Sequence, residues 1–252
     1  AGLSGMDVRL QGDELYDWER VTQLLAEQSP WWTPGSASGY HALTQGYLIG
    51  EVVRRITGIS LGRFFAEQIA GPLNADFLIG VPDSEFHRIG NLIPPPDAAV
   101  LGQGAAKKSI PHRTFSSPII SALDSHTDGW RRAEIPAANG HGNARAVAKI
   151  HSALANGGRV GDVQLLSPEI CRSVMQARIE GPDLVLGGPM AFGLGFGLSP
   201  IKESRRNLCF WGGWGGSGAI IDQDNELSFS YVMNKMAGGL LGDTRGDQLA
   251  RA

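Results

Sequence analysis

The sequence lacks several features that would each assign a chain to a class of proteins. Among its 252 residues only Cys171 and Cys209 are cysteines, too few for a disulfide framework or a thiolate metal site and enough for one disulfide bond at most. No apolar run reaches the roughly eighteen residues of a membrane-spanning helix. We therefore predict no membrane span. A formal net charge of −3 leaves no excess of basic residues, so we also predict no nucleic-acid partner.

Signals for a metal or a cofactor are also missing. The six histidines show no His-Glu-x-x-His spacing. The glycines at 193, 195 and 197 superficially resemble a dinucleotide-binding loop, but no helix is expected to follow them. The segment 215–219 is close to a nucleophile elbow, yet it leads into a predicted strand and not into a helix. We therefore predict no metal site and no cofactor.

The apolar pattern divides the chain into a helical part and a strand part. Helical spacing with caps or glycine and proline stops predicts helices over residues 17–28, 43–57, 61–69 and 143–156, one that opens at residue 167 and one from residue 240. From Met190 to Met233, alternating and glycine-rich segments predict a meander of antiparallel strands. A helical block followed by such a meander indicates an α+β fold.

Residues 80–140 interrupt this order. They lose periodicity and gain prolines, three of them in succession at 94–96. We predict a long irregular segment with one or two short helices. A loop of that length inside a compact domain is mobile or functional.

Tyr40 stands where a tight turn meets a predicted helix. Pro34, Gly35 and the small residues up to Gly39 form the turn, and the helix then continues until Gly58 stops it. This setting holds a phenol rigidly at the rim of a cavity. Taken alone, the tyrosine would be a core aromatic whose hydroxyl bonds a backbone carbonyl.

The order of a Pro-Gly turn, Tyr40, a helix ending at Ile56-Thr57-Gly58, and then Gly-Pro-Leu at 71–73 resembles the second active-site motif of serine hydrolases related to class C β-lactamases. That family includes penicillin-binding proteins, β-lactamases, D-amino-acid peptidases and a group of esterases. The resemblance runs through the whole chain. It implies a β-lactamase/penicillin-binding-protein-like fold, with an antiparallel sheet flanked by helices and a helical subdomain, in a single domain over residues 1–252. It also implies that residues 80–140 cover the substrate cleft.

The resemblance further implies roles for individual residues. Tyr40 corresponds to the base, and Trp211-Gly212-Gly213-Trp214 lies on the strand where the family has Lys-Thr-Gly. Gly213 matches the glycine that lets substrate approach the backbone. The N–H of Trp214 would point into the oxyanion hole from an edge strand. Considered without the resemblance, the same four residues would be a glycine-rich strand pair stabilised by two tryptophans.

Trp211 and His141 bear on substrate binding. Trp211 offers an apolar face where the family's lysine supplies a cation for a substrate carboxylate, so neutral esters are predicted to be the better substrates. His141 lies in the loop 139–143 at the start of a predicted helix. In the family this loop borders the cleft; otherwise His141 would be a surface-loop histidine.

Two departures from the family pattern are evident. The tyrosine motif Tyr-x-Asn reads Tyr40-His41-Ala42, which argues against a β-lactamase. The Ser-x-x-Lys motif has one match, Ser199 and Lys202, between a glycine-rich strand and a polar hairpin tip and not at a helix start, so we predict that it is not the nucleophile.

The chain begins Ala1-Gly2-Leu3, which matches the end of a family segment located downstream of the nucleophile. We therefore expect a fragment, inactive by itself, whose Ser-x-x-Lys lies upstream. The predicted function of the parent is hydrolysis of small carboxylic esters through an acyl-enzyme, with acyl transfer chemically adjacent. The alternatives are a β-lactamase or D-alanyl peptidase of the same fold, or a non-catalytic homologue that binds an acyl or peptide ligand.

Overall fold

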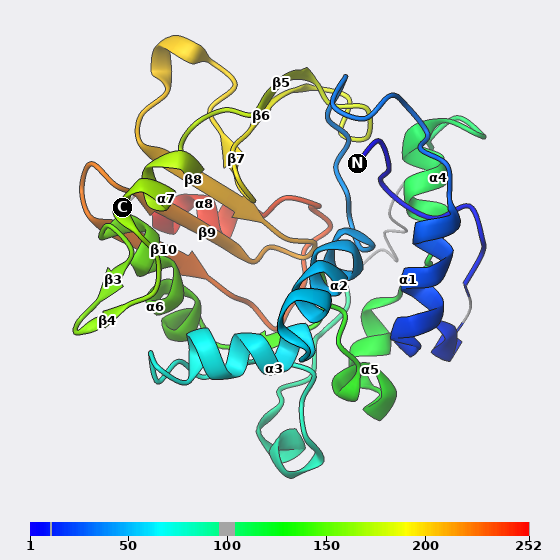
Figure 1. The fold of residues 1–252 in the computed structure, drawn as a ribbon, viewed down its shortest axis with the longest axis horizontal. Helices are drawn as coiled ribbons and strands as arrows, with labels where there is room; N and C mark the ends of the chain where they lie inside the picture. Colours follow the sequence, from blue (N-terminus) through cyan, green and yellow to red (C-terminus); the bar gives the residue numbers. More distant parts are fainter. Residues whose placement is uncertain (11, 96–103, 252) are drawn as a thin grey trace.

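A computed structural model describes residues 1–10, 12–95 and 104–251 of the chain (Figure 1). A six-stranded antiparallel sheet has the order β10-β9-β8-β7-β6-β5. Its strands are β5 (Ile179–Pro182), β6 (Pro189–Phe192), β7 (Gly197–Leu198), β8 (Leu208–Gly212), β9 (Gly218–Asp222) and β10 (Leu227–Tyr231). Each strand pairs with its neighbour in sequence, as predicted for a meander. The residues predicted to alternate near 192–198 form a hairpin, because Gly195 (φ 81°) turns the chain between β6 and β7.

One face of the sheet forms a core with α6 (Ala144–Ala155) and α7 (Pro168–Val174). Asn143 and Ser167 cap these helices by accepting hydrogen bonds from the N–H groups of Ala146 and Ile170, which confirms both predicted starts. Cys171 and Cys209 are buried in this core as free thiols. The one disulfide that the sequence allows is therefore not formed.

A second core lies in the helical block around α1 (Trp18–Glu27), α2 (Gln45–Thr57) and α5 (Asp128–Arg132), to one side of the sheet in Figure 1. Tyr47 is fully buried here and donates a hydrogen bond from its hydroxyl to the Leu15 carbonyl at 2.6 Å. Gly58 ends α2 in the left-handed conformation, as its position predicted. The helix predicted over 61–69 is α3 (Leu61–Phe65) followed by a π-helical turn, η2 (Ala66–Ala70).

The segment 80–140 contains two short α-helices, α4 (Ile110–Ser116) and α5, and two 3₁₀ helices, η3 (Asp83–Arg88) and η4 (Ala122–His126). Pro96 and the residues up to 103 lie outside the described part. The ends of the segment meet where β1 (Phe77–Ile79) pairs with β2 (Gly140–Gly142). The prediction of a loop over 139–143 was therefore wrong in part, because strand pairing that is distant in sequence orders its centre.

The remaining elements are η1 (Gly12–Tyr16), the hairpin of β3 (Arg159–Val160) and β4 (Val163–Gln164), η5 (Lys202–Ser204) and the predicted terminal helix α8 (Thr244–Arg251). None of the helices within the described residues is both long and apolar enough to cross a membrane.

Candidate active site

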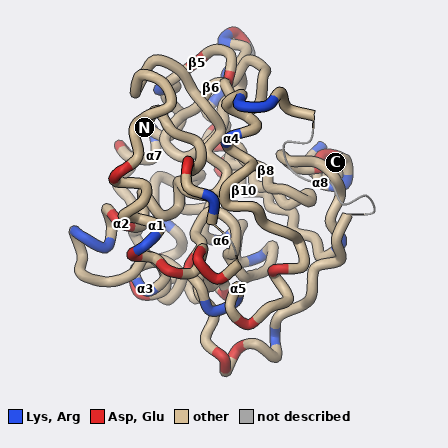
Figure 2. Tube along the Cα trace, turned by 90° about the vertical axis from the view of Figure 1, so that its right-hand side faces the viewer, with Lys and Arg blue, Asp and Glu red and all other residues tan. Residues whose placement is uncertain are grey.

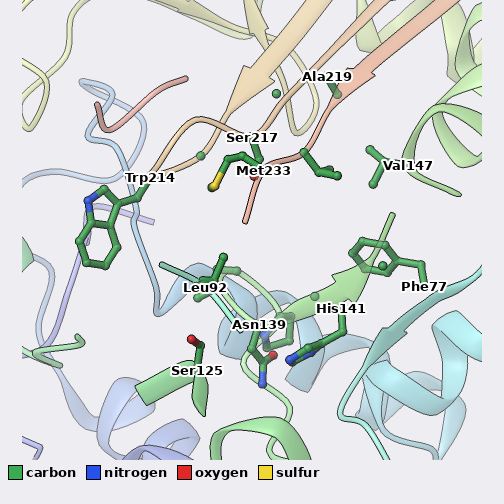
Figure 3. A pocket seen from close by; sticks show the side chains of 18 of the residues that line it. Phe77, Leu92, Ser125, Asn139, His141, Val147, Trp214, Ser217, Ala219 and Met233 are labelled. Carbon is green, nitrogen blue, oxygen red and sulfur yellow. The ribbon is translucent and has the colours of Figure 1, made fainter. Parts of the chain in front are cut away.

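A cavity of about 980 Å³ is lined by residues of the sheet, the helical block and the segment 80–140. All six predicted site residues line it: Tyr40, His141, Trp211, Gly212, Gly213 and Trp214. Figure 3 shows His141 and Asn139 on one side of the opening and Ser217 and Met233 on the other. The fold thus gathers residues that are up to 174 positions apart in the numbering, from Tyr40 to Trp214. Their chemical roles stay predictions.

Tyr40 belongs to the irregular connection between α1 and α2, four residues before the N-cap Thr44. Its ring packs against Trp211, with the ring centroids 5.5 Å apart and the planes tilted by 39°. Burial raises the pKa of Tyr40 above the ordinary value of a phenol. In the surroundings described, the phenol therefore keeps its proton at neutral pH.

Charged groups do not offset this burial. Within the described cavity lining, Arg88 is the only lysine or arginine, and it is paired with Asp76 at 2.5 Å and with Glu85 at 2.7 Å. In Figure 2 many charged positions lie on helices and loops, and β8 and β10 carry none. The sheet side of the cavity is consequently apolar and glycine-rich.

The end of β8 forms this sheet side. β9 pairs with β8 up to Gly212, and the Gly213 N–H continues the pairing by donating to the Ser217 carbonyl at 2.8 Å. On the other flank, the described pairing between β7 and β8 is confined to Gly197 and Phe210. The predicted edge strand is therefore an internal strand, and it becomes an edge locally because β7 is short.

The unpaired flank exposes backbone. No atom of the described residues accepts a hydrogen bond from the backbone N–H of Trp214. A Cβ at Gly213 would meet only Ser217 atoms, at 4.0 Å, so open space adjoins this backbone. At Gly212, by contrast, a Cβ would lie 2.6 Å from the carbonyl carbon and oxygen of Leu241. Packing explains the glycine at 212, whereas nothing in the packing requires one at 213.

His141 is the central residue of β2, opposite Leu78. Burial lowers the pKa of its imidazole and the charge of Arg131 adds to the shift, while the nearby Asn139 backbone opposes it. His141 is therefore neutral near pH 7. It is half-buried on the cavity wall, so the description as a surface-loop histidine does not hold.

The structure also shows where the residues that depart from the family pattern lie relative to the cavity. Ala42, at the position of the family's asparagine, lines the cavity with a methyl group. Ser199 and Lys202 lie outside the cavity lining, and Lys202 is exposed in the three-residue helix η5. The serines that line the cavity are Ser121, Ser125 and Ser217, and the residues three positions after them are Asp124, Asp128 and Ile220. None of these pairs forms Ser-x-x-Lys.

Among the polar cavity residues that sequence reasoning missed are Asn139 and His151. Asn139 is 2% exposed, accepts a hydrogen bond from the Ile135 N–H and donates to the carbonyls of Trp130 and Ala133. His151 donates from Nδ1 to the Val147 carbonyl at 2.8 Å, and burial lowers its pKa. The Asn-Gly-His-Gly run could have drawn attention to Asn139, but His151 sits in an ordinary amphipathic helix. No group of His, Cys, Asp and Glu within the described residues could hold a metal ion.

Comparison of the chain with known proteins identifies a family and several relatives. A profile described as "Beta-lactamase" matches residues 1–252. The chain is 34% identical over 251 residues to a Mycobacterium tuberculosis protein named esterase/beta-lactamase LipL, covering 96% of this chain and 58% of that protein. The chain thus spans little more than half the length of this relative.

Solved structures of related proteins resemble this chain over nearly its whole length. A family VIII carboxylesterase is 35% identical with a TM-score of 0.89, and a penicillin-binding-protein homologue from Caulobacter crescentus is 37% identical with a TM-score of 0.86. Each match covers 99% of this chain and 67% of the other chain. EstA from Arthrobacter nitroguajacolicus Rue61a is 28% identical with a TM-score of 0.83.

Proposed function

We propose that this chain, which belongs to the β-lactamase family, forms the base and half of the oxyanion hole of a serine hydrolase that cleaves small neutral carboxylic esters through an acyl-enzyme. The predicted β-lactamase/penicillin-binding-protein-like fold is confirmed by the close structural relatives. The observation that carries the proposal is the meeting of Tyr40 and the Trp211–Trp214 backbone in one cavity.

The nucleophile in this proposal is a serine of a Ser-x-x-Lys motif in a part of the full-length protein upstream of residue 1. Its hydroxyl attacks the ester carbonyl, its proton passes to the Tyr40 and lysine pair, and the alcohol leaves with a proton. Water then hydrolyses the acyl-enzyme. Because burial raises the pKa of Tyr40, the proposed mechanism requires the neighbouring ammonium of that lysine before the phenol can act as a base at neutral pH.

The oxyanion forms at the backbone in the proposed reaction. The Trp214 N–H donates to the carbonyl oxygen as it gains charge, and the open space beside Gly213 admits the acyl group. One donor of this kind contributes about 2.7–4 kcal/mol to lowering the barrier in a serine hydrolase. The second donor is the N–H of the upstream serine.

The choice of neutral esters rests on what borders the strand. The Trp211 ring packs against the rings of Tyr40 and Phe192, with 5.6 Å between the centroids of Trp211 and Phe192. Together these rings form an apolar wall. Arg88 is committed to Asp76 and Glu85, so the described lining offers no unpaired cation for a substrate carboxylate. This favours esters over β-lactams and D-alanyl peptides. In the same proposal, residues 80–140, which supply much of the lining, cover the cleft and select the substrate.

The test is intact-mass analysis of the full-length gene product after exposure to a fluorophosphonate. We expect one adduct on a serine of Ser-x-x-Lys, and a loss of labelling rate of at least 100-fold on Tyr40→Phe because the proton acceptor is removed. Turnover of p-nitrophenyl butyrate should exceed that of nitrocefin. An adduct on Ser199 would overturn the assignment of the nucleophile. No adduct at all would instead favour the non-catalytic binding homologue.

A further inference from the structure

A buried carboxylate outside the cavity holds the backbone of Tyr40. The Tyr40 N–H donates to Asp183 Oδ1 at 3.0 Å, although the two residues are 143 positions apart. A second bond, from the Leu184 N–H to the Ser38 carbonyl at 2.9 Å, joins the same two segments. Tyr40 lies in a connection without regular secondary structure. These two hydrogen bonds therefore fix its backbone in place of the hydrogen bonds of a helix or strand.

Asp183 is itself rigidly held. It sits in the turn between β5 and β6, where Oδ1 also accepts hydrogen bonds from the N–H groups of Val185 and Leu186 at 2.9 Å each. Its main chain bonds Gly187 and Gly188 across the turn. The residue is 2% exposed. A carboxylate in this position orients the Tyr40 amide by accepting a hydrogen bond of ordinary length.

The turn alone does not explain the charge. Val185 and Leu186 could be capped by a neutral asparagine or serine oxygen, as in ordinary Asx and ST turns. Burying a carboxylate is costly unless it is well paired, and Oδ2 has no hydrogen-bond partner in the described structure. One oxygen therefore carries every bond, and the one that leaves the turn goes to Tyr40. What the Tyr40 loop requires at position 183 is therefore an acceptor oxygen that reaches beyond its own turn.

We propose that Asp183 is a positioning residue of the reaction. Asp183 fixes the main chain of Tyr40 through a hydrogen bond, while Trp211 packs against the Tyr40 ring. Asp183 does not line the cavity, so it acts through Tyr40 and not on the substrate. The inference rests on the proposed function for its catalytic part. The structural part, that Asp183 orders the Tyr40 loop, stands independently.

Two variants separate positioning from turn stability. Asp183→Ser keeps an oxygen that caps its own turn but is too short to reach the Tyr40 N–H, whereas Asp183→Asn keeps an oxygen at the same place. We expect kcat for p-nitrophenyl butyrate to fall 10- to 100-fold in the serine variant with KM changed less than threefold, because small misplacements of a catalytic group have effects of that size. The asparagine variant should stay within about threefold of wild type in kcat.

The matched control is Asp222→Ser. Asp222 Oδ1 caps the turn between β9 and β10 by accepting from the N–H groups of Asp224 and Asn225, and it has no bond to the Tyr40 loop. This variant should keep wild-type kcat. Amide hydrogen exchange, measured by mass spectrometry on a peptide covering residues 36–44, gives a second readout in the same full-length proteins. Exchange there should accelerate in Asp183→Ser and remain unchanged in the control.

Equal kcat values for the serine and asparagine variants would overturn the positioning role. Unchanged exchange at 36–44 in Asp183→Ser would overturn the structural part as well. If the wild-type protein turns over no ester, the proposed function fails, and hydrogen exchange still decides whether Asp183 holds the loop.

Discussion

The part of the cavity lining at the end of β8, the sheet wall, combines open backbone at Gly213 with the side chains of Trp211 and Trp214, whereas the Tyr40 loop and residues 139–143, the side-chain wall, contribute a phenol, an imidazole and a buried amide. On the sheet wall, open space adjoins Gly213, and the Trp214 backbone N–H has no acceptor among the described residues. On the side-chain wall, the Tyr40 backbone is bonded to Asp183 and His141 pairs with Leu78, both far away in the sequence, whereas the Asn139 amide bonds residues 130–135 nearby. A sheet ladder orders backbone by itself, but a loop needs side-chain contacts to do so.

The largest expected effect comes from adding a single methyl group to the sheet wall. Gly213→Ala places a Cβ where only Ser217 lies near, at 4.0 Å, so folding should be unaffected. The methyl would occupy space beside the proposed oxyanion site, and ester turnover should fall at least 100-fold. Stopped-flow acylation and thermal unfolding of the full-length protein measure both quantities.

Gly212→Ala is the companion variant. Its Cβ would lie 2.6 Å from the Leu241 backbone, so we expect a loss of about 1–3 kcal/mol in unfolding free energy from the forced shift. If the alanine at 213 destabilised the fold as much as the alanine at 212, the division between a packing glycine and an access glycine would be wrong.

The second effect concerns the side-chain wall. Asn139→Ala removes an acceptor for the Ile135 N–H and a donor to the carbonyls of Trp130 and Ala133, and leaves these buried groups unpaired. Unfolding free energy should fall by about 2–3 kcal/mol, which urea titration measures. Asn156→Ala removes one exposed bond to the Ser152 carbonyl and should change stability by less than about 1 kcal/mol. Equal effects would show that burial does not distinguish the two amides.

The smallest effect is a pH dependence next to Tyr40. Burial lowers the pKa of His41 to about 4, and its Nε2 shares a hydrogen bond with Thr44 Oγ1. In the unfolded chain His41 titrates near 6.5, so the unfolded state binds the extra proton between these two values. The contribution to stability is complete above about pH 6.5 and is lost as pH falls towards 4.

His41→Gln removes this titration and keeps a group that can bond Thr44. We expect wild type to lose about 1–2 kcal/mol more than the variant between pH 7 and pH 4, because the ring is still partly exposed. Urea unfolding at pH 7, 5.5 and 4 measures the difference. Parallel stability curves for the two proteins would contradict the assignment of this acid sensitivity to His41.

Local signals explain why the helices were predictable. Asp17, Asn143 and Ser167 cap helices where the sequence places them, and Gly58 ends α2, because capping and left-handed glycine act within a few residues. The strand meander was predictable for a similar reason, since each strand pairs with the next one along the chain. The pairing of β1 with β2 was missed, because it joins segments that are 63 residues apart from Leu78 to His141.

By itself, then, the sequence determined the α+β class, the helix ends, and the family resemblance carried by Tyr40 and the residues Trp211–Trp214. Only the tertiary structure decided that β8 is an internal strand exposed by a short β7, that His141 lines the cavity and that Asp183 holds Tyr40. Caps, stops and hairpins depend on interactions between near neighbours in the chain. A cavity wall depends on which distant segments pack together, and no short stretch of sequence contains that information.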